Sequence, residues 1–248
     1  MKHSEKYRVH YHDTDRNFNL KLFYMAKYMQ ETALAAFDRL ESPRRELTEK
    51  KLAFILSKMS FRFEGEIKKF DEIRVDTWFL PMKSITVIRN YRIFNETMGT
   101  YAVRATSSWA LVNINEKTIV RPSALSENFT AVIDDEELGI NSARRIDKPN
   151  EIKLSDDNYL FEREVLYSDI DENTHMNNTI YLDIVENSIW KTARGILPGK
   201  LRTLDIAYNN GASEGDCISI WGVRTAGNIY IHGEIGAIDC FDAKACFE

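Results

Sequence analysis

The stretch YSDIDENTHMNNTIYLDIVENSI, residues 167–189, decides how the rest of the chain is interpreted. Its first half places carboxylate, amide and imidazole side chains at every second position: Asp169, Asp171, Asn173 and His175. If residues 163–171 run as a strand, its last carboxylates share one face with the polar groups just beyond them. From Asn178 onward, apolar residues recur at helical spacing. This spacing predicts a helix that begins directly after the polar residues.

The start of the predicted helix offers hydrogen-bond donors. Asn177 or Asn178 is a natural N-cap, because an asparagine side chain accepts a hydrogen bond from the first backbone N–H groups. Those N–H groups are otherwise unpaired and carry partial positive charge, so they would stabilise an anion or a polarised carbonyl beside Asn173 and His175. The sequence therefore predicts a strand end, a polar turn and a helix start.

The polar residues and the tyrosine that follows them form the pattern Asp-x-Asn-x-His-x-Asn-Asn-x-x-Tyr: Asp171, Asn173, His175, Asn177, Asn178 and Tyr181. This pattern resembles the second-half motif of acyl-acyl-carrier-protein thioesterases. The resemblance implies two tandem hotdog modules, each a curled antiparallel sheet around one long helix. It also implies hydrolysis of the thioester of fatty acyl-acyl-carrier protein, with release of free fatty acid.

An internal repeat also indicates two modules. Four polar residues of the quoted stretch have counterparts at one constant offset: Tyr11, Asp13, Asp15 and Asn17. An apolar helical face follows in both copies, and in the first copy it covers residues 22–40. The counterpart of His175 is Asn19, so the first copy lacks the imidazole. We therefore expect a structural or substrate-binding first module and a catalytic second module.

Runs rich in β-branched and aromatic residues predict strands after each helix. They cover residues 54–63, 73–79, 85–94 and 100–114 in the first half, and 203–208, 217–225, 229–235 and 237–247 in the second. Each half is therefore an α+β module. Because the pattern weakens after Pro122, we predict an N-terminal module at 1–130, a surface connection at 131–158 and a C-terminal module at 159–248.

Composition is typical of a soluble globular protein, with 248 residues, 44% hydrophobic and 29% charged. Three cysteines without metal-ligand spacing and a polar start at residues 1–10 lead us to expect a reduced, cytoplasmic protein without a cofactor. No metal spacing joins His232 or the other histidines outside the motif to carboxylates. No apolar run approaches the roughly 20 residues of a membrane-spanning helix, and a net charge of −5 argues against general nucleic-acid binding.

The resemblance assigns Asn173 and His175 to orienting the thioester carbonyl and water, and Asp171 to holding the catalytic side chains. One expected residue is absent. The family has a glutamate three positions after a strand tyrosine, whereas Tyr208 is followed here by Asn209, Asn210 and Gly211. Glu214 is a tentative replacement for this base. His175 or Asp171 acting as the base, or slow hydrolysis, are the alternatives.

Acyl carrier protein is the partner that the resemblance implies. Four basic pairs are candidates for meeting an acidic carrier surface: residues 44–45, 50–51, 68–69 and 144–145. Met25 and Met29 are candidate walls of an acyl-tail slot. Two other functions stay open: hydrolysis of acyl-CoA, and non-catalytic binding of acyl groups or of the carrier, which the glycine at position 211 keeps open. Assembly into a homodimer is also left open.

Overall fold

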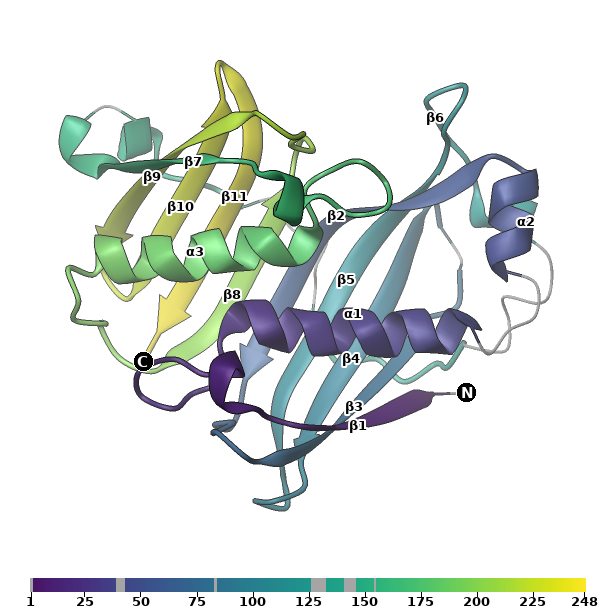
Figure 1. Cartoon of the computed structure of the whole chain (residues 1–248), viewed down its shortest axis with the longest axis horizontal. Coiled ribbons are helices and arrows are strands. Elements are labelled where there is room, and N and C mark those ends of the chain that lie inside the picture. Colours follow the sequence, from purple (N-terminus) through teal and green to yellow (C-terminus); the bar gives the residue numbers. More distant parts are fainter. Residues whose placement is uncertain (1, 39–42, 83, 126–132, 141–145, 154) are drawn as a thin grey trace. The chain divides into compact units, whose positions relative to one another are not determined.

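The computed structural model describes residues 2–38, 43–82, 84–125, 133–140, 146–153 and 155–248 (Figure 1). The chain divides into two compact units. The first comprises Met1–Leu20 and Tyr24–Ala143, and the second comprises Arg144–Glu248 together with Lys21–Phe23. Each unit contains one antiparallel sheet and one long helix, so the predicted α+β class is confirmed.

In the first unit a long helix lies on one face of the sheet (Figure 1). The elements in chain order are β1 (His3–Arg8), η1 (Tyr11–Asp13), α1 (Leu22–Asp38), α2 (Pro43–Glu49), β2 (Leu52–Phe63), β3 (Glu72–Phe79), β4 (Thr86–Asn95), β5 (Thr100–Asn113), β6 (Thr118–Ile119) and η2 (Pro122–Ala124). The strands are ordered β1-β3-β4-β5-β2, with β6 paired to β5. The predicted apolar face of α1 is buried at Met25, Met29 and Ala33, whereas Leu40 lies outside the described residues.

The second unit repeats this plan. Its elements are η4 (Asn150–Lys153), η5 (Asp156–Asn158), β7 (Tyr159–Glu164), η6 (Tyr167–Asp169), α3 (Asn178–Thr192), β8 (Leu201–Tyr208), β9 (Cys217–Thr225), β10 (Asn228–Ile235) and β11 (Ile238–Phe247). The strand order is β8-β11-β10-β9-β7. Every strand predicted after the two helices is present, with ends within two residues of the prediction. In the described part of the chain, no helix is long and apolar enough to cross a membrane.

The strand predicted over residues 163–171 is wrong. Strand β7 ends at Glu164, and the 3-10 helix η6 follows it. The reason lies in Asp169, whose carboxylate accepts hydrogen bonds from the backbone N–H of Leu166 at 2.9 Å and from Nη2 of Arg163 at 2.7 Å. These bonds close the chain into a turn and bury Asp169. It therefore does not share a strand face with His175.

The internal repeat is confirmed in backbone detail. The N–H of Asn17 donates to Oδ1 of Asp15 at 2.8 Å, and the N–H of Asn173 donates to Oδ1 of Asp171 at the same distance. The residue after each asparagine is left-handed, with φ of 65° and 64°. One sequence pattern therefore produces the same polar turn in both units.

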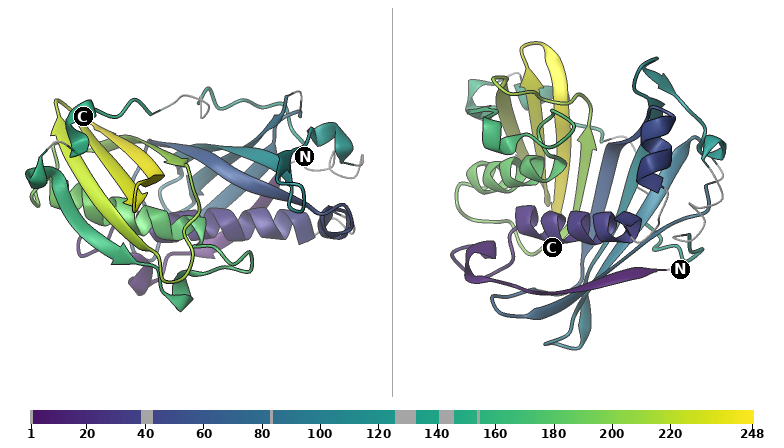
Figure 2. Two further views of the ribbon diagram at one scale, coloured as in Figure 1. Left: turned by 90° about the horizontal axis from the view of Figure 1, so that it is seen from above. Right: turned by 45° about the vertical axis from the view of Figure 1, so that its right-hand side comes forward.

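The predicted surface connection is anchored to the sheets, on the faces that the long helices leave uncovered (Figure 2). In the first unit, Nε1 of Trp78 on β3 donates to the carbonyl of Glu136 at 2.9 Å. In the second unit, Ile152 of η4 is only 2% exposed. Residues 131–132, 141–145 and 154 of the connection lie outside the described residues.

Candidate active site

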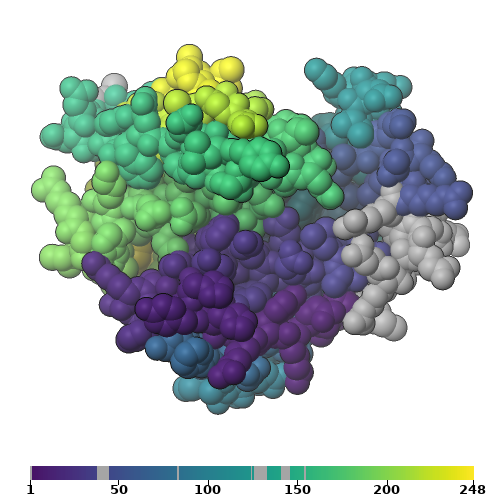
Figure 3. All heavy atoms as spheres, viewed as in Figure 1, coloured from purple at the N-terminus to yellow at the C-terminus, as the bar shows by residue number. Residues whose placement is uncertain are grey.

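The turn between η6 and α3 brings three predicted site residues together. The backbone N–H of Asp171 donates to the carbonyl of His175 at 3.0 Å, and Oδ1 of Asp171 accepts from the N–H of Asn173 at 2.8 Å. The side chains of Asn173 and His175 are exposed, and the green segment near residue 170 lies at the surface in Figure 3. The turn therefore exposes the amide of Asn173 and the imidazole of His175 two residues apart, and the Asp171 carboxylate supports its backbone.

The hydrogen bond of His175 fixes the tautomer of its neutral ring. Nδ1 lies 2.8 Å from the backbone carbonyl oxygen of Asn173. A carbonyl oxygen only accepts, so Nδ1 must carry the proton and donate it. In the neutral ring the lone pair is then on Nε2. The group available to take a proton is therefore Nε2 of His175.

Helix α3 begins beside this turn. Asn177 is the N-cap, as predicted, because its Oδ1 accepts from the N–H of Thr179 at 2.9 Å. The neighbouring N–H groups of the first turn point out of the helix start. They supply the positive end of the helix dipole next to the polar turn.

The loop after β8 is held against the turn. The N–H of Met176 donates to the carbonyl of Ala212 at 2.8 Å, and the N–H of Ala212 donates to the hydroxyl of Tyr181 at 3.1 Å. A β-carbon at Gly211 would lie 3.0 Å from Cδ2 of His175. The absence of a side chain at Gly211 therefore provides room for the imidazole.

Glu214 is the one predicted site residue without a hydrogen bond to this turn in the described part of the chain. Its side chain is exposed, in the tight turn that precedes β9. Within the described ranges, no hydrogen bond or ion pair joins its carboxylate to Asp171, Asn173 or His175.

Two buried residues behind the loop were not predicted as part of the site. The hydroxyl of Tyr181 accepts from Ala212 and lies 3.9 Å from Sγ of Cys240. Burial raises the pKa of the Tyr181 hydroxyl above its usual value and raises that of the Cys240 thiol to about 11. Cys240 is the extra residue of a bulge in β11, which an apolar strand pattern does not reveal.

The first unit carries a different set of side chains at the matching positions. Nζ of Lys68 donates to Oδ1 of Asn19 at 2.5 Å and pairs with Glu66 at 3.1 Å. Glu66 is the counterpart of Gly211, because Lys68 and Asp71 form the same backbone-to-carboxylate hydrogen bond as Ser213 and Asp216: 2.8 Å in the first unit and 2.7 Å in the second. The first copy thus keeps a glutamate and lacks the histidine, and the second copy does the reverse.

The predicted basic pairs are largely engaged within the first unit. Lys50 pairs with Glu46, and Arg45 pairs with Glu49, each at 2.7 Å. Nζ of Lys69 lies 4.3 Å from the ring centroid of Phe18. The side chain of Arg44, and Arg144 with Arg145, lie outside the described residues.

Two family models match this chain in tandem. The acyl-ACP thioesterase N-terminal domain, where ACP is acyl carrier protein, matches residues 1–133. The acyl-ACP thioesterase C-terminal domain matches residues 153–232. The chain belongs to the acyl-ACP thioesterase family.

Solved structures of acyl-ACP thioesterases share the fold over the whole chain. An acyl-ACP thioesterase from Bacteroides thetaiotaomicron is 20% identical, with a TM-score of 0.81 over 100% of this chain and 98% of that one. The 12:0-ACP thioesterase from Umbellularia californica is 14% identical, with a TM-score of 0.82 over 100% of this chain and 94% of that one. The predicted fold of two tandem hotdog modules is confirmed by this likeness.

A curated relative is similar over part of its length. The chloroplastic palmitoyl-acyl carrier protein thioesterase of Gossypium hirsutum is 26% identical over 140 residues. That segment is 55% of this acyl-ACP thioesterase family member and 33% of the cotton protein. The chain thus matches about a third of the length of this curated relative.

Proposed function

We propose that this family member hydrolyses the thioester of fatty acyl-acyl carrier protein and releases free fatty acid. One observation supports the chemistry above all others. Nδ1–H of His175 donates a hydrogen bond to the Asn173 carbonyl. Nε2 of this exposed ring is therefore the atom that can act as a base. Family membership supports the substrate class.

The proposed reaction uses His175 first as a base and then as an acid. Nε2 takes a proton from water while the water oxygen attacks the thioester carbonyl carbon. We assign stabilisation of the developing oxyanion to the side-chain amide of Asn173 and to the positive end of the α3 dipole. The C–S bond then breaks, and the imidazolium returns the proton to the departing thiolate.

We assign the base to His175 rather than to Glu214 or Asp171. The carboxylate of Asp171 already accepts the N–H of Asn173, which suits it to holding the turn. The Glu214 side chain is exposed and forms no hydrogen bond to the turn within the described residues. Of the three candidates, only His175 offers a nitrogen lone pair, at Nε2, on a side chain whose orientation a hydrogen bond fixes.

We also propose that the two modules have different roles. Residues 1–130 bind the acyl chain, residues 131–158 connect the modules, and residues 159–248 carry out the hydrolysis. Met25 and Met29 lie on the buried face of α1, where flexible thioether side chains suit the wall of a tail slot. We assign the reaction to fatty acid biosynthesis in the cytoplasm.

The test is thiol release from acyl-ACP and acyl-CoA thioesters of matched chain length. We expect His175→Ala to lower kcat by about 10²- to 10⁴-fold, the usual contribution of a positioned acid or base. His10→Ala, which removes an exposed histidine of the first unit, is the matched control and should retain full turnover. If the wild type binds acyl-ACP without releasing thiol, the protein is a binding protein and the hydrolytic proposal is wrong.

Carrier preference has its own test. Docking of an acidic carrier should weaken as salt screens the charges, so acyl-ACP turnover at low substrate concentration should fall with ionic strength. Turnover of the matched acyl-CoA serves as the reference. Equal salt dependence for both substrates would argue against electrostatic docking of the carrier.

A further inference from the structure

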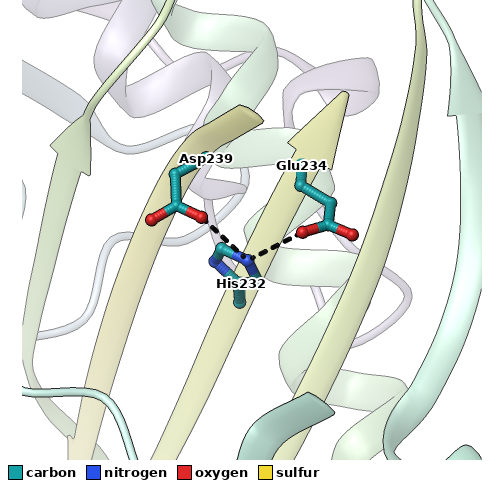
Figure 4. Close-up of side chains that lie close together, drawn as sticks. All are labelled: His232, Glu234 and Asp239. Carbon is teal, nitrogen blue, oxygen red and sulfur yellow. Dashed lines mark ion pairs between the residues drawn. The ribbon is translucent and has the colours of Figure 1, made fainter. Parts of the chain in front are cut away.

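A second cluster of polar side chains lies on the sheet of the second unit, on the face that α3 does not cover. It comprises His232 and Glu234 of β10 and Asp239 of β11, which point toward one another in Figure 4. Nε2 of His232 is 3.6 Å from Oε2 of Glu234 and 3.5 Å from Oδ1 of Asp239. One potential ligand atom of each residue therefore lies within 4.8 Å of the other two.

A β-bulge creates this convergence. Gly233 pairs with Phe241 and Glu234 pairs with Asp239, which leaves Cys240 as the extra residue. In a regular strand, Asp239 and Asp242 would point to opposite faces, because they are separated by an odd number of positions. The bulge returns Asp239 to the face that carries His232 and Asp242.

The ring of His232 is oriented, and one of its nitrogens lacks a partner. His232 is 0% exposed, and Nε2 has no hydrogen-bond partner, since both nearby carboxylate oxygens are beyond hydrogen-bond distance. Nδ1 lies 2.8 Å from Oδ1 of Asp242. A carboxylate only accepts, so Nδ1–H donates to it, and Nε2 faces two further carboxylates. In the neutral ring the Nε2 lone pair repels these carboxylates, unless a proton on Nε2 or a bound cation lies between them.

We propose that Nε2 of His232, Glu234 and Asp239 bind a divalent transition-metal ion of the Zn²⁺ class. Metal–ligand distances of about 2.0–2.2 Å in a tetrahedral site separate ligand atoms by roughly 3.3–3.5 Å, close to the separations from Nε2. The side chain of Asp239 is 54% exposed, which leaves a path for the ion and a position for water. Asp242 orients the ligand histidine from behind, as carboxylates do at many histidine–metal sites.

Two lysines of the connection compete with the ion. Nζ of Lys148 lies 3.3 Å from Oδ2 of Asp239 and 3.1 Å from Oδ1 of Asp242, so Oδ1 of Asp239 stays available. It also lies 3.0 Å from Nδ1 of His232. Lys153 pairs with Oε2 of Glu234, the same oxygen that faces the site. The ion must therefore displace Lys153, and removing that lysine should strengthen metal binding.

The proposed site connects to the loop after β8. Nδ2 of Asn209 donates to Oδ2 of Asp242 at 3.0 Å, and Nδ2 of Asn210 donates to the carbonyl of Asp239 at 2.8 Å. Binding of an ion would fix both acidic residues. We therefore expect the ion to stabilise the bulge and this loop, and we assign it no step in thioester hydrolysis.

The experiment is titration of the metal-free chain with Zn²⁺ in competition with a chromophoric chelator, with Co²⁺ absorption as a second probe. We expect one Zn²⁺ per chain and a higher Tm in its presence. Asp239→Asn should weaken affinity at least tenfold, and Asp242→Asn by about 10- to 100-fold. Lys153→Met should bind Zn²⁺ more tightly than the wild type.

Two controls separate this site from other binding. Asp157→Asn removes an exposed acid of η5 and should leave Zn²⁺ affinity unchanged. His175→Ala should also keep one Zn²⁺ per chain, so this inference stands or fails apart from the proposed hydrolysis. Absence of stoichiometric Zn²⁺ binding, or equal affinity for the wild type and Asp239→Asn, would overturn the proposal and leave His232 within a network of ion pairs.

Discussion

The imidazole of His175 lies directly against the α-carbon of Gly211, so a β-carbon at that position would come within 3.0 Å of Cδ2. Real β-carbon contacts are seldom this close, and the ring is the nearest group that could move. The ring is also held by the bond from Nδ1 to Asn173. The side chain at position 211 therefore controls where Nε2 of the proposed base can lie.

Gly211→Ala is expected to lower kcat about tenfold, because displacing a catalytic group by a fraction of an ångström degrades its alignment. KM should change less than kcat, since the substituted atom faces the base. Ser213→Ala, an exposed substitution in the same loop, is the control. Unchanged kcat in Gly211→Ala would show that the ring tolerates the displacement.

Gly211→Glu tests whether a base is missing. It adds the same β-carbon as Gly211→Ala, together with the carboxylate that the sequence resemblance leads us to expect at this position. If His175 is sufficient as the base, Gly211→Glu should be no faster than Gly211→Ala in thiol release. If Gly211→Glu were faster than the wild type, the result would instead show that this chain has lost a catalytic base at position 211.

The N-cap of α3 is expected to contribute about 1 kcal/mol to the free energy of unfolding. Oδ1 of Asn177 accepts from both the N–H and the hydroxyl of Thr179, at 2.9 and 2.8 Å, and Asn177→Ala removes both bonds. Urea denaturation measures the loss. The control is Asn187→Ala in the exposed middle of the helix, where alanine has the higher helix propensity and no loss is expected. An equal effect of the two substitutions would contradict the capping role.

Asp169→Asn is expected to destabilise the second unit by about 2 kcal/mol, because it weakens charge-assisted hydrogen bonds to a buried group. Its carboxylate accepts from Nη2 of Arg163 at 2.7 Å and from the N–H of Leu166 at 2.9 Å. Asp157→Asn is the exposed control. Chemical denaturation of the pair measures the difference, and similar midpoints would show that the turn does not depend on the charge.

The three cysteines should differ in reactivity toward iodoacetamide at pH 8. Cys217 is exposed and should be alkylated first. Burial raises the pKa of the Cys240 thiol to about 11 and shields it, so little thiolate is present and Cys240 should react only after unfolding. Peptide mass spectrometry of native and urea-treated protein checks the order. Equal native labelling of Cys217 and Cys240 would contradict the buried environment.

Local patterns predicted most of the fold. The spacing of Met25, Met29 and Ala33 predicted the buried face of α1, and β-branched runs predicted the strands that follow each helix. The repeat predicted two similar turns, because the same carboxylate accepts the same backbone N–H in both copies. These features depend on residues close in sequence, so a sequence pattern contains the information that specifies them.

Side-chain contacts that follow no periodic pattern were not predictable in this way. The strand predicted through Asp169 fails because Arg163 draws that carboxylate into a turn. The surroundings of Cys240 and Asp239 depend on a bulge, which a single sequence does not mark. In the sequence, His232 resembles an ordinary strand residue. Only the pairing of β10 with β11 shows that Asp242 lies against its ring.

The sequence by itself determined the two modules, their helices and strands, and the turn that carries Asp171, Asn173 and His175. Only the tertiary structure decided which nitrogen of His175 is free, that Gly211 makes room for its ring, and that Glu214 forms no hydrogen bond to this turn within the described residues. It also brought His232, Glu234 and Asp239 together. The physical reason is that helices and strands follow from periodic burial that a sequence pattern shows, whereas the environment of a side chain depends on side-chain hydrogen bonds, loop packing, bulges and strand register, which no periodic pattern specifies.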